Sequence, residues 1–183
     1  FVQEGRANLS VDVVSKKAGH QIDFVLSGDG DGLKVQLPEH EIAVGKLVFK
    51  SEGRLTDYKT LSVDSLTTRL GPEVDPVLSA SWPFKLDFDR KIVSGHLVAS
   101  GKLPVVSAWI PKLKVNFRSG TFDCNGSLGL KFGESDEQNF EGELLLRNLT
   151  GGDEKYSVTN LTARALLKAN LGGGRHLKIE SFN

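Results

Sequence analysis

Hydrophobic and polar residues alternate along most of the chain, which is the pattern of strands that bury one face and expose the other. Leu9, Val11 and Val13 alternate with polar neighbours in the first such run. The same two-residue period returns at 21–26, 33–37, 42–49, 61–63, 82–88, 128–132 and 140–146. The sequence therefore predicts a mostly β protein.

Glycine-rich and polar stretches separate these runs, and we predict turns there because glycine adopts positive φ and Asp or Asn side chains bond to the turn backbone. The predicted turns are 16–19, 28–32, 71–76, 125–126, 133–137 and 151–153. Asp29 and Asp31 would also be candidate calcium ligands, but no carboxylate follows them at the spacing of an EF-hand loop. The alternation shifts phase near Gly45, which predicts a β-bulge.

One short stretch departs from the strand pattern and predicts a helix near 104–110. Pro104 suits a first helical position, where its missing N–H is not needed. Pro111 ends regular helix by about residue 110. The apolar residues have the one-face spacing of a helix, at Val106, Trp109, Ile110 and Leu113. A single apolar helical turn in a β protein is typical of a plug or lid on a sheet.

The segment 162–170 is ambiguous from sequence alone. Its composition favours a helix, whereas alternation of Leu161, Ala163, Ala165 and Leu167 favours a strand. The β context decides for a strand. Apolar and polar residues alternate in the same way on both sides of the 71–76 loop, so we expect a single β-rich domain over residues 1–183.

The balance of charge argues against partners that are recognised by bulk charge. The chain has 23 Lys and Arg against 23 Asp and Glu, so its formal net charge is zero. We therefore expect no nucleic-acid partner. Cys124 is the only cysteine, which excludes an internal disulfide and favours a small buried hydrophobe. The chain begins within a pattern at Phe1 and has no Met, so we expect a piece of a longer protein.

No catalytic or metal-binding motif is present in the sequence. The four histidines, His20, His40, His96 and His176, are far apart and form no metal-spaced pair. No nucleophile elbow, P-loop or dinucleotide fingerprint occurs. We therefore expect no enzyme activity, no cofactor and no metal.

Four large apolar residues lie on one face of the run 82–88. They are Trp82, Phe84, Leu86 and Phe88, with Pro83 suggesting an edge or a strand start. Such a stripe is usually core, and the alternative is a wall that an apolar ligand contacts.

The stretch that begins with the predicted helix resembles a known family. It reads Gly101-Lys102-Leu103, a short apolar helix with a proline break, and then Ser119-Gly120-Thr121-Phe122 followed by Gly126-Ser127-Leu128. The segments 140–149 and 160–165 match the same pattern of glycine and alternating apolar residues. This order resembles the AsmA and TamB family of large bacterial envelope proteins with a repeating β-groove. The resemblance covers residues 80–183.

The resemblance implies a folded-over, taco-like antiparallel sheet whose apolar groove shields acyl chains while phospholipids move between membranes, or assists outer-membrane assembly. The implied partners are phospholipid acyl chains and neighbouring β-groove segments of the parent protein, which would be periplasmic, anchored in the inner membrane and in contact with the membrane. The implied lining residues are Trp82, Phe84, Phe88, Val106, Trp109, Ile110, Phe117, Phe122, Leu128, Leu130, Leu144 and Leu146. Two other interpretations stay open: a structural β-domain with a closed core, and a carbohydrate- or protein-binding β-sandwich in which Trp82 or Trp109 stacks on a sugar.

Overall fold

The computed structural model describes the backbone of residues 2–36, 41–108, 116–133, 137–153, 155–170 and 176–182, with side chains within 5–34, 45–108, 116–133, 138–153 and 155–170. Its elements are β1 (Val2–Lys16), the 3-10 turn η1 (Lys17–Gly19), β2 (Gln21–Gln36), β3 (Glu41–Thr56), β4 (Thr60–Leu70), β5 (Leu78–Ser81), β6 (Phe84–Asp87), β7 (Ile92–Lys102), α1 (Leu103–Ala108), β8 (Asn116–Lys131), β9 (Glu137–Gly152), β10 (Ser157–Asn170) and β11 (His176–Phe182).

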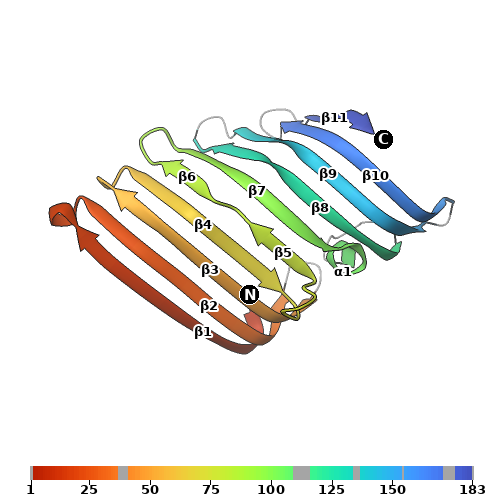
Figure 1. Ribbon diagram of the computed structural model, residues 1–183, viewed down its shortest axis with the longest axis horizontal. Helices are drawn as coiled ribbons and strands as arrows, with labels where there is room; N and C mark the ends of the chain where they lie inside the picture. Colours follow the sequence, from red (N-terminus) through yellow and green to blue (C-terminus); the bar gives the residue numbers. More distant parts are fainter. Residues whose placement is uncertain are drawn as a thin grey trace.

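The strands form one antiparallel sheet in which the spatial order follows the chain order (Figure 1). The order is β1-β2-β3-β4-β5-β7-β8-β9-β10-β11, and β6 continues beyond β5 between β4 and β7. The strands curve along their length, and α1 lies at the margin where β7 ends and β8 begins (Figure 1). The expected fold class, a mostly antiparallel β protein with one short helix, is confirmed.

Strand register places apolar residues on one side of the sheet from β1 to β10. Residues that pair directly in an antiparallel ladder point to the same side, so the pairs can be followed from strand to strand. Four long rows of the apolar face are Ala7–Gly30–Leu47–Leu70–Leu78–Gly101–Phe122–Leu146–Ala163, Leu9–Gly28–Phe49–Thr68–Ala80–Ala99–Cys124–Leu144–Ala165, Val13–Phe24–Gly53–Val63–Phe84–Gly95–Leu128–Phe140–Ala169 and Ser15–Ile22–Leu55–Leu61–Leu86–Val93–Leu130–Gln138. A shorter row on the same face is Val11–Leu26–Ser51–Leu66. These rows contain no charged residue.

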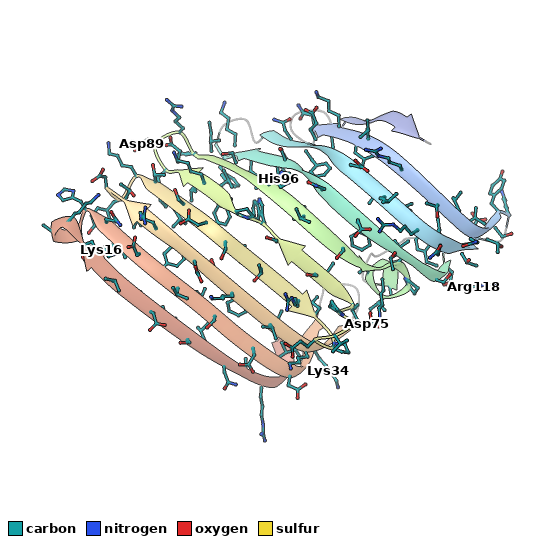
Figure 2. All side chains as sticks on the ribbon, viewed as in Figure 1. Lys16, Lys34, Asp75, Asp89, His96 and Arg118 are labelled. Carbon is teal, nitrogen blue, oxygen red and sulfur yellow. The ribbon has the colours of Figure 1, made fainter. Side chains whose placement is uncertain are left out.

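The alternate residues form the polar face. One of its rows runs Asn8–Asp29–Val48–Arg69–Ser79–Ser100–Asp123–Leu145–Arg164. The charged side chains gather on this face and at the turns. Figure 2 shows Lys16 and Asp89 at one margin of the sheet, and Asp75 and Arg118 at the margin that carries α1.

Burial in this sheet is shallow. Among the described residues no large side chain is completely buried, and the most buried apolar residues are scattered along the sheet, such as Val63 at 4% and Ala163 at 2% exposure. A sheet that packs face to face against a second sheet should bury most side chains of its inner face. The described strands instead form one layer whose apolar face is partly open.

Two predicted turns are wrong, because the glycines in them lie inside long strands. Residues 28–32 belong to β2, and Asn125-Gly126 lies in the middle of β8. The Phe49 ring lies over Gly28, and the Phe140 ring lies over Gly126. These glycines provide room for an aromatic ring on a neighbouring strand, which local sequence does not distinguish from a turn.

Four other local predictions are confirmed. The turn at 16–19 contains η1, and the 71–76 loop joins β4 to β5. Gly45 has φ +69°, and the register between β2 and β3 shifts beside it, as expected for a bulge. The ambiguous segment 162–170 is strand within β10. Gly151 and Gly152 of the predicted turn 151–153 instead end β9, and residues 134–136 of the predicted turn 133–137 lie outside the described residues.

The run 82–88 is not the single strand that alternation predicts. Trp82 and Pro83 separate β5 from β6, and Phe88 lies in the turn after β6. Pro83 lacks the N–H that a continuous ladder would need, although its carbonyl still accepts a bond from the His96 N–H at 3.1 Å.

Candidate apolar binding face

Aromatic rings lie over glycines in the apolar face. Four phenylalanines each have a glycine as their register partner on the next strand. The pairs are Phe24–Gly53, Phe49–Gly28, Phe84–Gly95 and Phe122–Gly101. In each pair an added β-carbon on the glycine would lie within 3 Å of an atom of the phenylalanine side chain. These phenylalanine side chains therefore pack against the backbone of the next strand, and the sheet gains an aromatic covering without a second layer.

Trp82 and Phe84 form the aromatic centre of the apolar face. Their ring centroids are 4.8 Å apart with planes tilted by 33°. Gly95 lies directly beneath them, because a β-carbon there would meet both Trp82 Nε1 and Phe84 Cβ. The indole N–H is buried and has no hydrogen-bond partner. An unpaired donor of this kind reduces the stability of the sheet, and Gly95 makes the close aromatic packing possible.

The exposure of the apolar face increases toward β1. Val63 and Val93 near the middle are buried at 4% and 7% exposure, whereas Leu9 is 66% and Val13 59% exposed. Phe24, Phe84, Phe122, Leu128 and Leu144 are half-buried. An open apolar surface of this extent is unusual for a soluble monomer and is typical of a surface that contacts an apolar partner.

The helix α1 packs against β8 at one margin of the sheet. Gly120 of β8 has φ +124°, a conformation that favours glycine, and an added β-carbon there would lie 3.3 Å from Leu103 Cδ1. Val106 in α1 is half-buried. The helix thus lies at the margin of the sheet, beside the end of β7 and the start of β8. Trp109 and Ile110 lie outside the described residues.

Most of the predicted lining residues lie together. Six of them share the apolar face: Phe84, Phe122, Leu128, Leu130, Leu144 and Leu146. Trp82 contacts this group over Gly95, whereas Phe88 is exposed in a turn. Phe117 lies beyond two register shifts in β8 and packs on Gly151.

The predicted lining omits the N-terminal half of the apolar face. The apolar face continues through β1, β2 and β3, where it includes Val13, Phe24, Leu26 and Phe49. Their alternation was visible in the sequence, but the family resemblance directed the predicted lining to residues 80–183. The apolar face is therefore wider than the predicted lining.

Ion pairs between neighbouring strands occupy the polar face. Asp23 accepts hydrogen bonds from Lys16 Nζ at 2.6 Å, Arg54 Nε at 2.8 Å and Gln21 Nε2 at 2.9 Å. These donors, Lys16 first, hold the pKa of Asp23 well below its usual range. Arg164 makes a two-pronged pair with Glu143, and Lys168 pairs with Glu141 at 3.2 Å. A face with paired charges suits contact with water.

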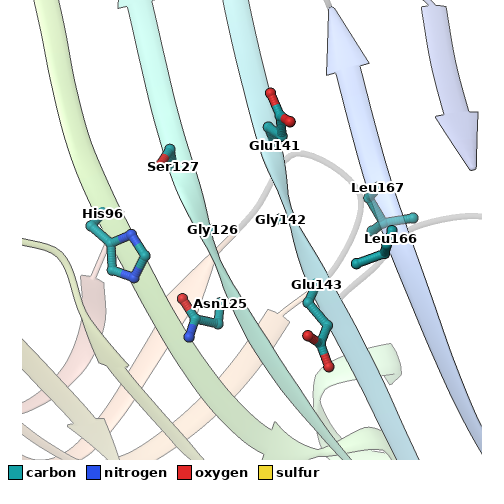
Figure 3. Close-up of a pocket in the computed structure, with 9 residues that line it drawn as sticks. All are labelled: His96, Asn125, Gly126, Ser127, Glu141, Gly142, Glu143, Leu166 and Leu167. Atoms are coloured by element: carbon teal, nitrogen blue, oxygen red, sulfur yellow. The ribbon is translucent and has the colours of Figure 1, made fainter. Parts of the chain in front are cut away.

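A shallow hollow of about 380 Å³ lies on the polar face between β7 and β10. Figure 3 shows His96, Asn125 and Glu143 on successive strands around it, with Leu166 from β10. Glu143 is already paired with Arg164. The depression follows from Gly126 and Gly142, which lack side chains, and its residues do not converge on a common point in the way that a catalytic site requires.

The described residues contain no group of three or more His, Cys, Asp or Glu that could hold a metal ion. Cys124 lies on the apolar face between Ala99 and Leu144, and burial raises the pKa of its thiol. A thiol with a raised pKa is a weak nucleophile at neutral pH. The chemistry that this face offers is contact with apolar groups.

Where the structure describes the chain, none of its helices combines the length and apolarity needed to cross a bilayer. Comparisons with known protein families, curated proteins and solved structures found no match to this chain. The resemblance to the AsmA and TamB family therefore stays a prediction from the sequence pattern.

Proposed function

We propose that this chain is a segment of an AsmA/TamB-like protein of the bacterial envelope, and that its apolar face shields phospholipid acyl chains. In this proposal the parent protein lies in the periplasm, is anchored in the inner membrane, and moves phospholipid between membranes or assists outer-membrane assembly. Neighbouring β-groove segments of the parent would extend the surface.

One observation carries the proposal: the apolar face is continuous from β1 to β10 and is partly open. Contact with an acyl chain removes apolar area from water, which contributes about 0.8 kcal/mol for each buried CH₂ group. The phenylalanine side chains that pack over glycines add aromatic area to this surface. A lipid tail needs such a continuous surface and no polar contact.

The distribution of charge supports recognition of the tail over the headgroup. The rows of the apolar face contain no charged residue, and the polar face holds its Asp and Glu side chains largely in ion pairs. Binding should then arise from apolar burial and depend little on salt or on the headgroup.

Titration with a fluorescent fatty acid tests the proposal. We expect saturable binding with an affinity that changes less than about twofold between about 0.1 M and 1 M salt, since screening acts on charges. Leu144→Asn should weaken binding by about tenfold, because it removes an apolar contact from the apolar face.

Leu145→Asn is the matched control, because Leu145 is the next residue of β9 and lies on the polar face between Asp123 and Arg164. This variant should bind the probe like the unmodified chain. Equal loss in both variants, or no binding to a folded chain, would contradict the proposal and favour a structural domain whose apolar face is covered by another part of its protein.

A further inference from the structure

Among the described strands, β1 is a long edge strand of the sheet. It pairs with β2 alone in the part of the chain that the structure describes. The carbonyl oxygens of Arg6 and Asn8 lie beside Gly30 and Gly28 of β2. Because peptide groups alternate in direction along an antiparallel strand, the peptide groups of Ala7, Leu9 and Val11 point away from the sheet and are available to another strand.

Two charged residues of β1 have no ion-pair partner in the described part of the chain, although Lys16 at the end of this strand pairs with Asp23. Arg6 and Asp12 make no ion pair with the described residues, although Asp23, Glu141 and Glu143 all do. Asp31, which lies opposite Arg6 in register, accepts a bond from the Gly32 N–H instead. Arg6 and Asp12 lie at equal sequence distances on either side of Leu9, so the strand is self-complementary about Leu9.

We propose that β1 pairs antiparallel with β1 of a second copy of this chain, with the twofold axis at Leu9. This register places Arg6 of each copy opposite Asp12 of the other, which forms two ion pairs. It also places Leu9 opposite Leu9 and Ala7 opposite Val11, all on the apolar face. A shift by two residues in either direction leaves Arg6 opposite Ser10 or Val14, so the ion pairs select one register.

The pairing accounts for the exposure of β1. Leu9, Val11 and Val13 are among the most exposed apolar residues of the apolar face. Long apolar edges with open peptide groups favour pairing with another chain, and β1 has no proline and no bulge between Arg6 and Lys16. The dimer would continue the apolar face of one copy into that of the other. The inference does not rest on the proposed function, because it concerns the β1 edge and its charges. If both hold, neighbouring segments of the parent extend the sheet from β11, the opposite edge.

The proposed pairing can be tested by measuring the sedimentation of variants in which the charges of Arg6 and Asp12 are reversed. The unmodified chain should show a monomer–dimer equilibrium that weakens as salt increases. Arg6→Glu and Asp12→Arg should each weaken the dimer by about tenfold or more, because each variant places two pairs of like charges across the axis. The double variant R6E/D12R should restore the affinity, since both pairs become attractive again.

Mixing the two single variants gives the sharpest result. A copy with Arg6→Glu and a copy with Asp12→Arg attract each other at both pairs, so the mixture should form a heterodimer at concentrations where each variant alone is monomeric. A chain that stays monomeric at all concentrations would overturn the inference. So would oligomers that form equally well in every variant.

Cross-linking tests the register. In a Cys124→Ser background, Leu9→Cys should form a disulfide between copies, because directly opposed residues have Cα atoms within disulfide range. Ala7→Cys is the control and should not cross-link, since Ala7 lies opposite Val11. Cross-linking through position 7 and not position 9 would overturn the proposed register.

Discussion

Gly126→Val should destabilise the protein by about 3 kcal/mol, because no space exists for a side chain at this point of β8. A β-carbon on Gly126 would lie 2.6 Å from the Glu141 carbonyl oxygen, 2.7 Å from the Phe140 ring and 2.8 Å from the Gly142 Cα. Two of these atoms belong to the backbone of β9, so relief requires the strands to separate. Urea unfolding followed by circular dichroism measures the change.

Gly129→Val in the same strand is the control. Nothing lies within 4 Å of the position that its β-carbon would occupy. Valine also favours strands, so this variant should be neutral or slightly more stable, within about 0.5 kcal/mol. Equal destabilisation in the two variants would show that glycine is needed in β8 for its flexibility, and would contradict the close packing of rings on glycines.

Val93→Asp should also cost about 3 kcal/mol, because it places a carboxyl group on the buried centre of the apolar face. Val93 is 7% exposed and lies between Leu86 and Leu130 in the ladder. Burial should raise the pKa of the introduced carboxyl group. Its destabilising effect is then largest above that pKa and decreases as the pH falls and the group becomes neutral.

Val98→Asp provides the matched control, because it makes the same change in the same strand. Val98 lies on the polar face and is 45% exposed. We expect a change within about 0.5 kcal/mol that varies little with pH. Thermal unfolding of both variants at neutral and acid pH measures the difference. Similar losses at positions 93 and 98 would mean that the two faces of the sheet do not differ in burial.

The sequence predicts the strands and their two faces well, because each depends on local alternation. The runs at Leu9–Val13 and Phe140–Leu146 are strands as expected, and the ambiguous segment 162–170, which the β context assigns to a strand, lies in β10. Alternation also predicts which residues share a side within one strand. It does not predict register, so the alignment of Phe122 with Leu146 and Gly101 required the structure.

The sequence-based prediction of turns fails at glycines that lie inside strands. Gly126 follows Asn125 in a pair that is typical of hairpins, yet it lies in a strand beneath Phe140. Gly28 belongs to a predicted turn, yet it lies in β2 beneath Phe49. In each case the ring that explains the glycine comes from another strand, so a local pattern cannot contain the reason. Gly19 and Gly71, which lie in turns, have positive φ, a conformation that glycine adopts readily.

The most direct test of the central claim is photo-crosslinking from adjacent residues of one strand, whose side chains point to opposite faces of the sheet. A photoreactive amino acid at Phe122 or Leu144 would lie on the apolar face, and one at the adjacent Asp123 or Glu143 would lie on the polar face. With the folded chain bound to phospholipid, positions 122 and 144 should capture lipid and positions 123 and 143 should not. Equal capture from both sets, or none from either, would contradict a lipid-shielding apolar face.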